Sequence, residues 1–316
     1  MENPTETEVL GPQDVARAAQ LLRAGELVAM PTETVYGLAG DARNPESVAA
    51  IFAAKGRPAH NPLIVHLDSL DAAERFAALP APAHKLAQAF WPGALTLVAP
   101  LRHGHGLAQA VTAGLPTVAL RVPAHPLARA LLAEFGGPVA APSANPSGRI
   151  SPTTAAHVMA GLAGRIAAVL DGGPCPVGVE STILGFEDET PVLLREGGIS
   201  AERIATVLGD APRAHSGAGI SAPGQMLSHY APSAQVRLDV STPRDDEIWI
   251  GFGPDCADAA LSLSPSGNLE EAATTLFATL HQADAMGRPI AIAPVPRSGI
   301  GAAINDRLRR AAAPRD

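Results

Sequence analysis

Stretches with helical and strand-like spacing of apolar residues alternate along the first two thirds of the chain. A helical pattern over residues 15–22 precedes an apolar run over 27–30, and the same alternation then recurs. Further helices are predicted at 44–52, 83–90, 126–135, from Ser151-Pro152 onward and from Ser200, and further strands at 63–67, 94–98, 117–122, 138–141, 167–170, 179–184 and 192–195. This order of elements predicts an α/β sheet domain over residues 1–210.

The last third of the chain begins with a change of composition. Residues 211–234 are rich in Gly, Ser, Pro and Ala and show no periodicity, which predicts a linker. Beyond it, a second and smaller α/β unit over 235–316 is predicted from strand patterns at 236–240, 247–252, 261–263 and 290–293 and helical patterns at 268–286 and 301–312. A length of 316 residues fits this division.

Composition and termini narrow the class of protein. With 47% hydrophobic and 17% charged residues, the sequence is typical of a packed globular chain. Acidic residues at the N-terminus and the lack of an uninterrupted apolar stretch of about 20 residues predict a cytoplasmic protein without a membrane segment. Cys175 and Cys256 are too few for a disulfide framework or a zinc site, so we assign no metal-binding residues.

Common nucleotide and hydrolase motifs are missing. The sequence contains no P-loop, no Gly-x-Ser-x-Gly and no His-Glu-x-x-His. Residues 217–222 match the dinucleotide pattern Gly-x-Gly-x-x-Ala, but they follow no strand and open no helix, so the match is interpreted as chance.

One short run is cationic in an otherwise acidic chain. The sequence has 31 Asp and Glu against 23 Lys and Arg, and Lys55 and Arg57 stand together at the junction between a predicted helix and a predicted strand. This run, 55–62, is a candidate anion-binding site. The alternative is a solvated turn that carries two ordinary surface cations.

Polar residues also gather just beyond predicted strands, where open α/β sheets bind ligands. Two clusters follow strands: residues 31–38, and residues 141–148 leading to Ser151 at an expected helix N-terminus. A third cluster, residues 180–182, interrupts a later predicted strand. Each cluster alone is equally compatible with a capped turn. Their occurrence together with Lys55, Arg57, Arg121 and Arg195 favours a ligand site.

Eight segments, in order and at similar spacing, resemble the threonylcarbamoyl-AMP synthase family, the two-domain form of the YrdC-like superfamily. They are PTETVYGL (31–38), KGRPAHNPLIVH (55–66), WPGALTLV (91–98), VALRVPAHP (118–126), APSANPSG (141–148), GVESTIL (178–184), LLREGGIS (193–200) and APGQMLSHYAP (222–232). The resemblance implies a twisted open mixed sheet with flanking helices, followed by a smaller Rossmann-like α/β domain. The linker departs from many relatives, because Leu227 and Ser228 stand where those relatives carry more basic residues.

The resemblance implies a nucleotidyltransferase that converts L-threonine, bicarbonate and ATP into threonylcarbamoyl-AMP and pyrophosphate. The product would serve tRNA threonylcarbamoyladenosine modification and pass to a tRNA threonylcarbamoyl-transfer complex. Mg²⁺ is expected to accompany ATP, held through the phosphates, and stable nucleic-acid binding is not expected.

The site residues implied by the resemblance fall into two groups, with Lys55 and Arg57 as the catalytic pair. Arg121 is expected to hold the threonine carboxylate bidentately, and the linker to fold over the cavity as a lid ordered by Tyr230. Expected around threonine are Thr34, His66, Arg121, Ala141 and Ser181. Expected around ATP are Lys55, Arg57, Asn61, Thr117, Ser143, Asn145, Ser151, Arg195 and Tyr230.

Two other functions are compatible with the fold. The first is a module that binds tRNA or double-stranded RNA without synthase activity, although residues 1–210 hold 14 Lys and Arg against 20 Asp and Glu and aromatic residues make up only 3% of the chain. The second is carbamoyl transfer to another acceptor, as in hydrogenase-maturation carbamoyltransferases. Those resemble this domain but carry acylphosphatase and zinc-finger modules that the sequence lacks.

Overall fold

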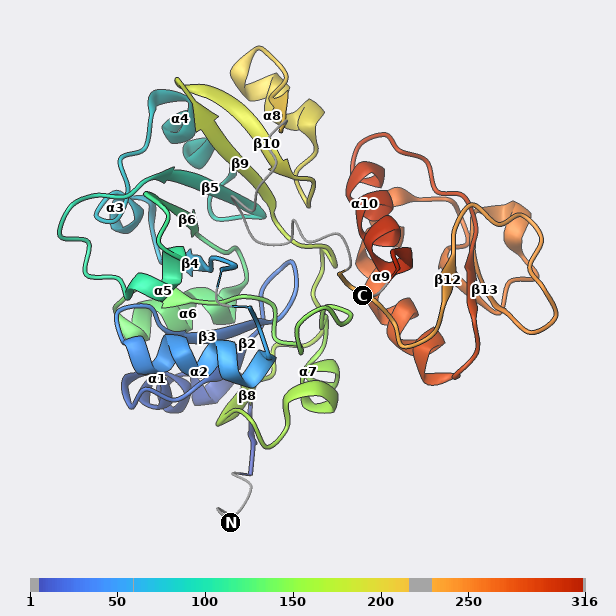
Figure 1. Cartoon of the computed structure of the whole chain (residues 1–316), viewed down its shortest axis with the longest axis horizontal. Coiled ribbons are helices and arrows are strands. Elements are labelled where there is room, and N and C mark those ends of the chain that lie inside the picture. The colour runs from blue at the N-terminus through green and yellow to red at the C-terminus, as the bar shows by residue number, and fades with distance from the viewer. Residues whose placement is uncertain (1–5, 59, 216–228, 315–316) are drawn as a thin grey trace.

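The computed structural model describes residues 6–58, 60–215 and 229–314. Figure 1 shows a large unit built around one long sheet and a smaller unit beside it. None of the helices in these described ranges combines the length and apolarity needed to cross a bilayer.

The large unit contains an eleven-stranded sheet with helices on its faces. Its helices are α1 (Val15–Arg23), α2 (Pro45–Lys55), α3 (Leu70–Ala73), α4 (Ala81–Phe90), α5 (Gln109–Thr112), α6 (Pro126–Phe135), α7 (Ala155–Leu162) and α8 (Ala201–Leu208), with a 3₁₀ turn at Pro12–Asp14. Its strands are β1 (Glu8–Leu10), β2 (Val28–Met30), β3 (Gly37–Asp41), β4 (Ile64–His66), β5 (Leu95–Pro100), β6 (Thr117–Arg121), β7 (Val139–Ala140), β8 (Ala168–Leu170), β9 (Thr182–Glu187), β10 (Thr190–Arg195) and β11 (Arg213–Ala214).

The strand order is β1-β8-β2-β3-β7-β4-β6-β5-β9-β10-β11. Parallel pairs such as β4 with β6 and β5 with β9 alternate with antiparallel pairs such as β4 with β7 and β5 with β6. The predicted mixed α/β sheet is therefore confirmed. Strands β3, β4, β6 and β10, the segment that follows β7 and the segment that precedes β9 all supply residues to the cavity described below.

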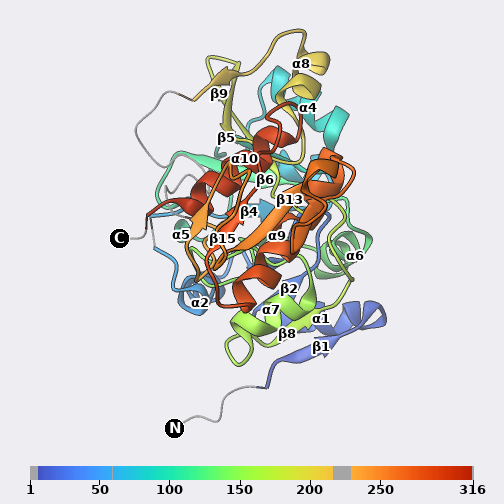
Figure 2. The ribbon, with the colours of Figure 1, turned by 90° about the vertical axis from the view of Figure 1, so that its right-hand side faces the viewer.

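The small unit has a four-stranded, wholly parallel sheet in the order β12-β15-β13-β14. Its elements are β12 (Val236–Arg237), β13 (Ile248–Phe252), a 3₁₀ turn at Pro254–Cys256, β14 (Leu261–Ser264), α9 (Leu269–Ala285), β15 (Ile290–Ile292) and α10 (Gly301–Ala312). Both helices lie on the side of this sheet that faces the large unit (Figure 1), and Figure 2 shows them in front of the large unit's middle strands.

Side-chain caps explain where several helices begin. The carboxamide of Asn44 accepts N–H groups at the start of α2, Asn268 does so for α9, and Ser200 caps α8, as the sequence indicates. A helix follows Ser151-Pro152 as predicted, but its predicted start is wrong. Helix α7 begins at Ala155, with Thr154 as its cap. The Ser151 hydroxyl instead donates to Glu180, at 2.5 Å, and is not available as a cap.

Four further differences from the sequence-based prediction concern strands. Residues 37–41 form β3, residues 8–10 form β1, and neither was predicted as a strand. Residues 180–182 precede or open β9 instead of interrupting a strand. Arg213 and Ala214, assigned to an unstructured linker, pair with β10 as β11. These segments are short, so their pairing partners and not their own patterns determine them.

One hydrophobic cluster joins the two units. Val35, Ile150 and Val179 of the large unit pack with Tyr230 and with apolar residues of α9, α10 and the small sheet, all buried. At its edge the Gly178 backbone, with φ of +77°, lies directly against α9, and a Cβ on Gly178 would lie 2.4 Å from the Ala273 carbonyl oxygen. The two units therefore share a continuous core, with a glycine required at the closest approach.

We expect Gly178→Ala to weaken the contact between the units. Gly173→Ala is the matched control, because Gly173 also has a φ of +77° but a Cβ there would meet nothing within 4 Å. Both variants carry the strain of a left-handed alanine, whereas only Gly178→Ala adds an overlap with helix backbone, which costs a further about 1–3 kcal/mol. Urea unfolding measures the difference, and equal free energies of unfolding for the two variants would contradict the close approach.

Candidate active site

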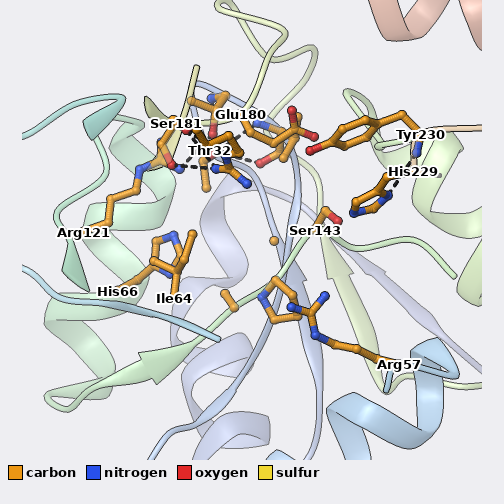
Figure 3. A pocket seen from close by; sticks show the side chains of 16 residues that line it. Thr32, Arg57, Ile64, His66, Arg121, Ser143, Glu180, Ser181, His229 and Tyr230 are labelled. Carbon is orange, nitrogen blue, oxygen red and sulfur yellow. Dashed lines mark hydrogen bonds between the residues drawn. The ribbon is translucent and has the colours of Figure 1, made fainter. Parts of the chain in front are cut away.

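A cavity lies where the ends of the central strands meet the start of the small unit. It has a volume of about 570 Å³ when space open to solvent is counted. Figure 3 shows Arg57, Arg121 and Tyr230 entering it from three different sides. Its lining residues are Thr32, Thr34, Val35, Gly37, Arg57, Ile64, His66, Arg121, Ala141, Pro142, Ser143, Glu180, Ser181, Arg195, His229 and Tyr230.

Arg121 is positioned by strand register, because parallel pairing of β4 with β6 sets it opposite His66. Its Nη2 donates to Glu33 Oε1 at 2.6 Å, Nη1 donates to Thr34 Oγ1 at 2.9 Å, and Nε donates to the Gly93 carbonyl at 3.2 Å. A guanidinium has five N–H groups, so these three bonds leave one N–H on each Nη. Arg121 is thus held in place by three hydrogen bonds, and the remaining N–H groups on Nη1 and Nη2, its outer edge, can bind a carboxylate.

Glu33 is the counter-charge of Arg121. The carboxylate also accepts the Ala124 N–H at 3.0 Å. Burial alone would raise the pKa of Glu33, but the charge and hydrogen bond of Arg121 outweigh burial and hold the pKa below its usual value. Glu33 is therefore ionised at neutral pH, and the pair is a buried, hydrogen-bonded ion pair.

His66 lies beside Arg121 and is uncharged. Burial, with a smaller contribution from Arg121, lowers the pKa of His66 to about 3. Among the described residues, its Nδ1 has no hydrogen-bond partner although it is buried. Because buried polar atoms are nearly always paired in folded proteins, this nitrogen is suited to a polar group of a ligand.

Arg195 and Ser181 form the wall opposite Arg57. The Arg195 Nη2 donates to the Ser181 carbonyl at 2.8 Å and to Ser181 Oγ at 3.1 Å, and Ser181 Oγ is hydrogen-bonded to Thr96 Oγ1 at 2.7 Å. Burial lowers the pKa of Arg195, although a guanidinium stays protonated. The hydroxyl and the guanidinium therefore act as one unit.

Arg57 reaches the cavity from the loop after α2. Its Nη2 donates to the Pro62 carbonyl at 2.9 Å, and burial lowers its pKa to about 10, so it carries a charge at neutral pH. Lys55 does not line the cavity but lies behind residues 143–145. Its Nζ donates to the carbonyls of Ser143 and Asn145 at 2.6 and 2.5 Å. The structure thus places Lys55 as a support for loop 143–145 and not on the cavity surface.

The structure brings nine of the fourteen expected site residues to the cavity wall, and five lie next to it: Lys55, Asn61, Thr117, Asn145 and Ser151. Asn61 is buried, and its carbonyl accepts a hydrogen bond from Arg57 Nε. Thr117 is the first residue of β6, two positions before Ala119, which pairs with Ile64 of β4. Asn145 donates to the carbonyls of Pro146 and Arg149, and its Oδ1 has no partner within the described ranges.

Tyr230 and His229 enter from the residues that precede the small unit. Their rings stack with centroids 4.1 Å apart, and Tyr230 has a φ of +62°. Of the expected lid, residues 216–228 lie outside the described residues. His229 and Tyr230 are buried and line the cavity, so these two residues of the linker already occupy one side of it.

Sequence reasoning assigned Thr32, Glu33 and Glu180 no individual role beyond their membership of the polar clusters 31–38 and 180–182, and it assigned His229 and Arg307 none at all. The first two stand in a polar cluster after β2, where the only signal was an acidic residue between two threonines. Glu180 accepts from Ser151 and from Arg307, which lies 127 positions away along the chain. That pairing is a tertiary contact, which local sequence patterns do not predict.

The described residues include no group of three His, Cys, Asp or Glu side chains arranged to hold a metal ion. The two carboxylates nearest the cavity, Glu33 and Glu180, are each engaged by an arginine.

Comparison with known proteins shows to which family the chain is similar. Residues 20–197 match a family model named Sua5_yciO_yrdC and described as telomere recombination, and residues 199–313 match one described as the threonylcarbamoyl-AMP synthase C-terminal domain. A threonylcarbamoyl-AMP synthase of Bacillus subtilis is 44% identical over 94% of this chain and 92% of its own.

Two other relatives are informative. The crystal structure of Pyrococcus abyssi Sua5 complexed with L-threonine has a TM-score of 0.88 and 39% identity, covering 97% of this chain and 98% of that one. A threonylcarbamoyl-AMP synthase of Halorhodospira halophila is 42% identical, but 57% of this chain spans 90% of it. With the fold, the cavity and these matches in agreement, the resemblance drawn from the sequence is confirmed, and the chain belongs to the threonylcarbamoyl-AMP synthase family.

Proposed function

We propose that this protein is an L-threonylcarbamoyladenylate synthase, a nucleotidyltransferase that uses L-threonine, bicarbonate and ATP and releases pyrophosphate. One observation carries the proposal. A single cavity in a chain of this family gathers three arginines, Arg57, Arg121 and Arg195, with two histidines and two serines. All of the substrates carry negative charge, and charge-assisted hydrogen bonds are worth about 1.5–3 kcal/mol each.

Threonine is proposed to bind at the end formed by β4 and β6. Its carboxylate would meet the outer edge of Arg121, and the unpaired Nδ1 of His66 would meet its amine or hydroxyl. Thr34, Ser181 and the backbone around Ala141 complete this end. Because His66 is neutral, its role is to position the substrate and not to carry charge.

ATP is proposed to occupy the opposite end, between the loop after α2 and the residues before the small unit. Arg57, Ser143, Arg195 and Tyr230 face this end. Lys55, Asn61, Thr117, Asn145 and Ser151 support it from behind, since they lie next to the lining residues without forming the wall.

The reaction is proposed to need no protein nucleophile. The threonine amine takes up the carbon of bicarbonate with loss of water, and an oxygen of the resulting N-carboxylate attacks the α-phosphorus as pyrophosphate leaves. That oxygen is already ionised at neutral pH, so positioning and electrostatic stabilisation by the arginines supply the acceleration. Mg²⁺ would be held by phosphate oxygens and water, because both nearby carboxylates are paired, and no step requires a protein ligand for it.

Residues 1–210 are proposed as the catalytic domain, 211–234 as the linker and 235–316 as a domain that closes against the first. The adenylate would pass to a tRNA threonylcarbamoyl-transfer complex in the cytoplasm. The protein itself is not proposed to hold nucleic acid stably.

Pyrophosphate release tests the function. We expect release to require threonine, bicarbonate and ATP together, with threonylcarbamoyl-AMP as the second product. Release without threonine would favour another carbamoyl acceptor. No release, combined with a salt-dependent shift of labelled tRNA, would favour the RNA-binding alternative.

Arg57→Ala is expected to lower kcat/KM at least tenfold, which corresponds to about 1.4 kcal/mol, because it removes one of the two cations placed at the ATP end, Arg57 and Arg195. Arg129→Ala, on the exposed face of α6, is the control and should retain activity. Steady-state pyrophosphate release measures both variants, with thermal melting to verify folding. An unchanged kcat/KM in Arg57→Ala would remove this residue from the site.

His66 is expected to make folding stability fall at acid pH. Its pKa is about 3 when folded and about 6.5 when unfolded, so between these values the unfolded chain binds the extra proton. Stability is therefore lost as the pH falls through 6.5, by up to about 2 kcal/mol from this group at pH 5.

Urea unfolding at pH 7, 6 and 5 measures this dependence. His66→Asn should flatten the slope by at most that amount, while the exposed His103→Asn serves as the control. A slope in His66→Asn identical to that of the unmodified protein would show that His66 is not buried in neutral form.

A further inference from the structure

Arg307 is the largest fully buried side chain of the described residues, yet it belongs to α10 of the small unit. Its Nε donates to Glu180 Oε2 at 2.9 Å, and its Nη1 donates to the Glu196 carbonyl at 2.6 Å and to Asp306 Oδ2 at 3.2 Å. Its Cζ also lies 5.5 Å from the centre of the Tyr230 ring. A charged side chain is rarely buried so completely unless its partners require it.

The two large-unit partners of Arg307 flank the Ser181–Arg195 wall of the cavity. Glu180 directly precedes Ser181, and Glu196 directly follows Arg195. The turn after Glu196 is pressed onto the same strand, because the Gly198 N–H donates to the Glu180 carbonyl and a Cβ on Gly197 would lie 2.2 Å from the Thr182 nitrogen. A guanidinium that binds both segments therefore fixes the spacing between them.

The charge of Glu180 gives Arg307 a second effect. Glu180 is buried and lines a cavity that must accept anions. The charged and titratable groups around it are Arg307 and Asp306 from α10, Arg195 from β10, and Tyr230, while Ser151 donates a hydrogen bond. Burial alone would raise the pKa of Glu180, but Arg307 and Arg195 hold it below its usual value. Without Arg307, Arg195 would be left as the cation balancing this carboxylate, and its charge would be diverted from the substrate.

We propose that Arg307 is a positioning residue of the synthase site: it neutralises and orients Glu180 so that Arg195 remains directed at the nucleotide and Ser181 at threonine. This assignment rests on the function proposed above. It gives the small unit a defined part in the reaction, since α10 supplies the cation without touching the substrates. Docking of the small unit and completion of the site then become one event.

Three variants test this role by pyrophosphate release: R307M, the double variant E180Q/R307M, and the control R309M. Arg309 lies on the same helix and is 3.9 Å from Asp306, but its side chain is 56% exposed. We expect R307M to lose at least tenfold in kcat/KM for ATP relative to R309M. The double variant should recover at least threefold of that loss, because it removes the carboxylate that R307M leaves unbalanced.

The pH profile supplies a readout that a purely structural role would not change. In R307M the Glu180 carboxylate should take up a proton more readily, so the loss relative to the unmodified protein should shrink as the pH falls from 8 to 6. If R307M does not fold, R307K tests the role of Arg307 in the same pyrophosphate-release assay. A lysine keeps the charge but cannot bind Glu180 and the Glu196 carbonyl together, so its loss should be smaller than tenfold and, because Glu180 still has its cation, should change little between pH 8 and 6.

Either of two results would overturn the proposal: R307M as active as R309M, or a loss that neither E180Q nor lower pH reduces. For R307K, activity equal to that of R309M or a loss of tenfold or more would do the same. Failure of the unmodified protein to form threonylcarbamoyl-AMP would instead refute the proposed function. The two failures are therefore distinguishable.

Discussion

Electrostatic repulsion among buried, desolvated cations is the constraint on which the arrangement of the cavity depends. Arg57, Arg195 and Lys55 all have pKa values lowered by burial, and each is further lowered by a neighbouring cation. Such a cluster costs folding free energy in the absence of ligand. A bound polyanion removes that cost, so the same arrangement that weakens the fold strengthens binding of a triphosphate.

The protein limits this repulsion by assigning each buried charge a fixed partner. Glu33 balances Arg121 and Glu180 balances Arg307, whereas the ammonium of Lys55 is held by two backbone carbonyls. Arg57 is bound to backbone carbonyl oxygens, which satisfy its hydrogen bonds without cancelling its charge. The charge left for a ligand is thus located on the side of the cavity that faces His229 and Tyr230, where we place ATP.

Local patterns predicted the elements with strong signals and missed those set by distant contacts. Asn44 and Asn268 cap helices as expected, since a cap needs only residues within one turn. Ser151 does not cap a helix, because Glu180, 29 positions away, takes its hydroxyl. In the site, motif resemblance indicated Arg121 and Arg195, but it gave no indication of Arg307, which contributes through a contact between the two units. Pairing across such separations depends on how the units dock, and local propensity and spacing do not encode docking.

A shorter relative indicates that the role of Arg307 belongs to the two-unit form of the protein. A synthase of Halorhodospira halophila matches little more than half of this chain over nearly its whole length, so it has no room for a complete second unit. If such a protein performs the same chemistry, a buried carboxylate at its cavity must be balanced from within its own sheet or be absent. In the present chain that balance comes from α10, and Tyr230 lies between the cation and the cavity. The small unit is therefore not a passive appendage, because its removal would leave Arg195 alone to balance Glu180 and would divert the charge of Arg195 from the substrates.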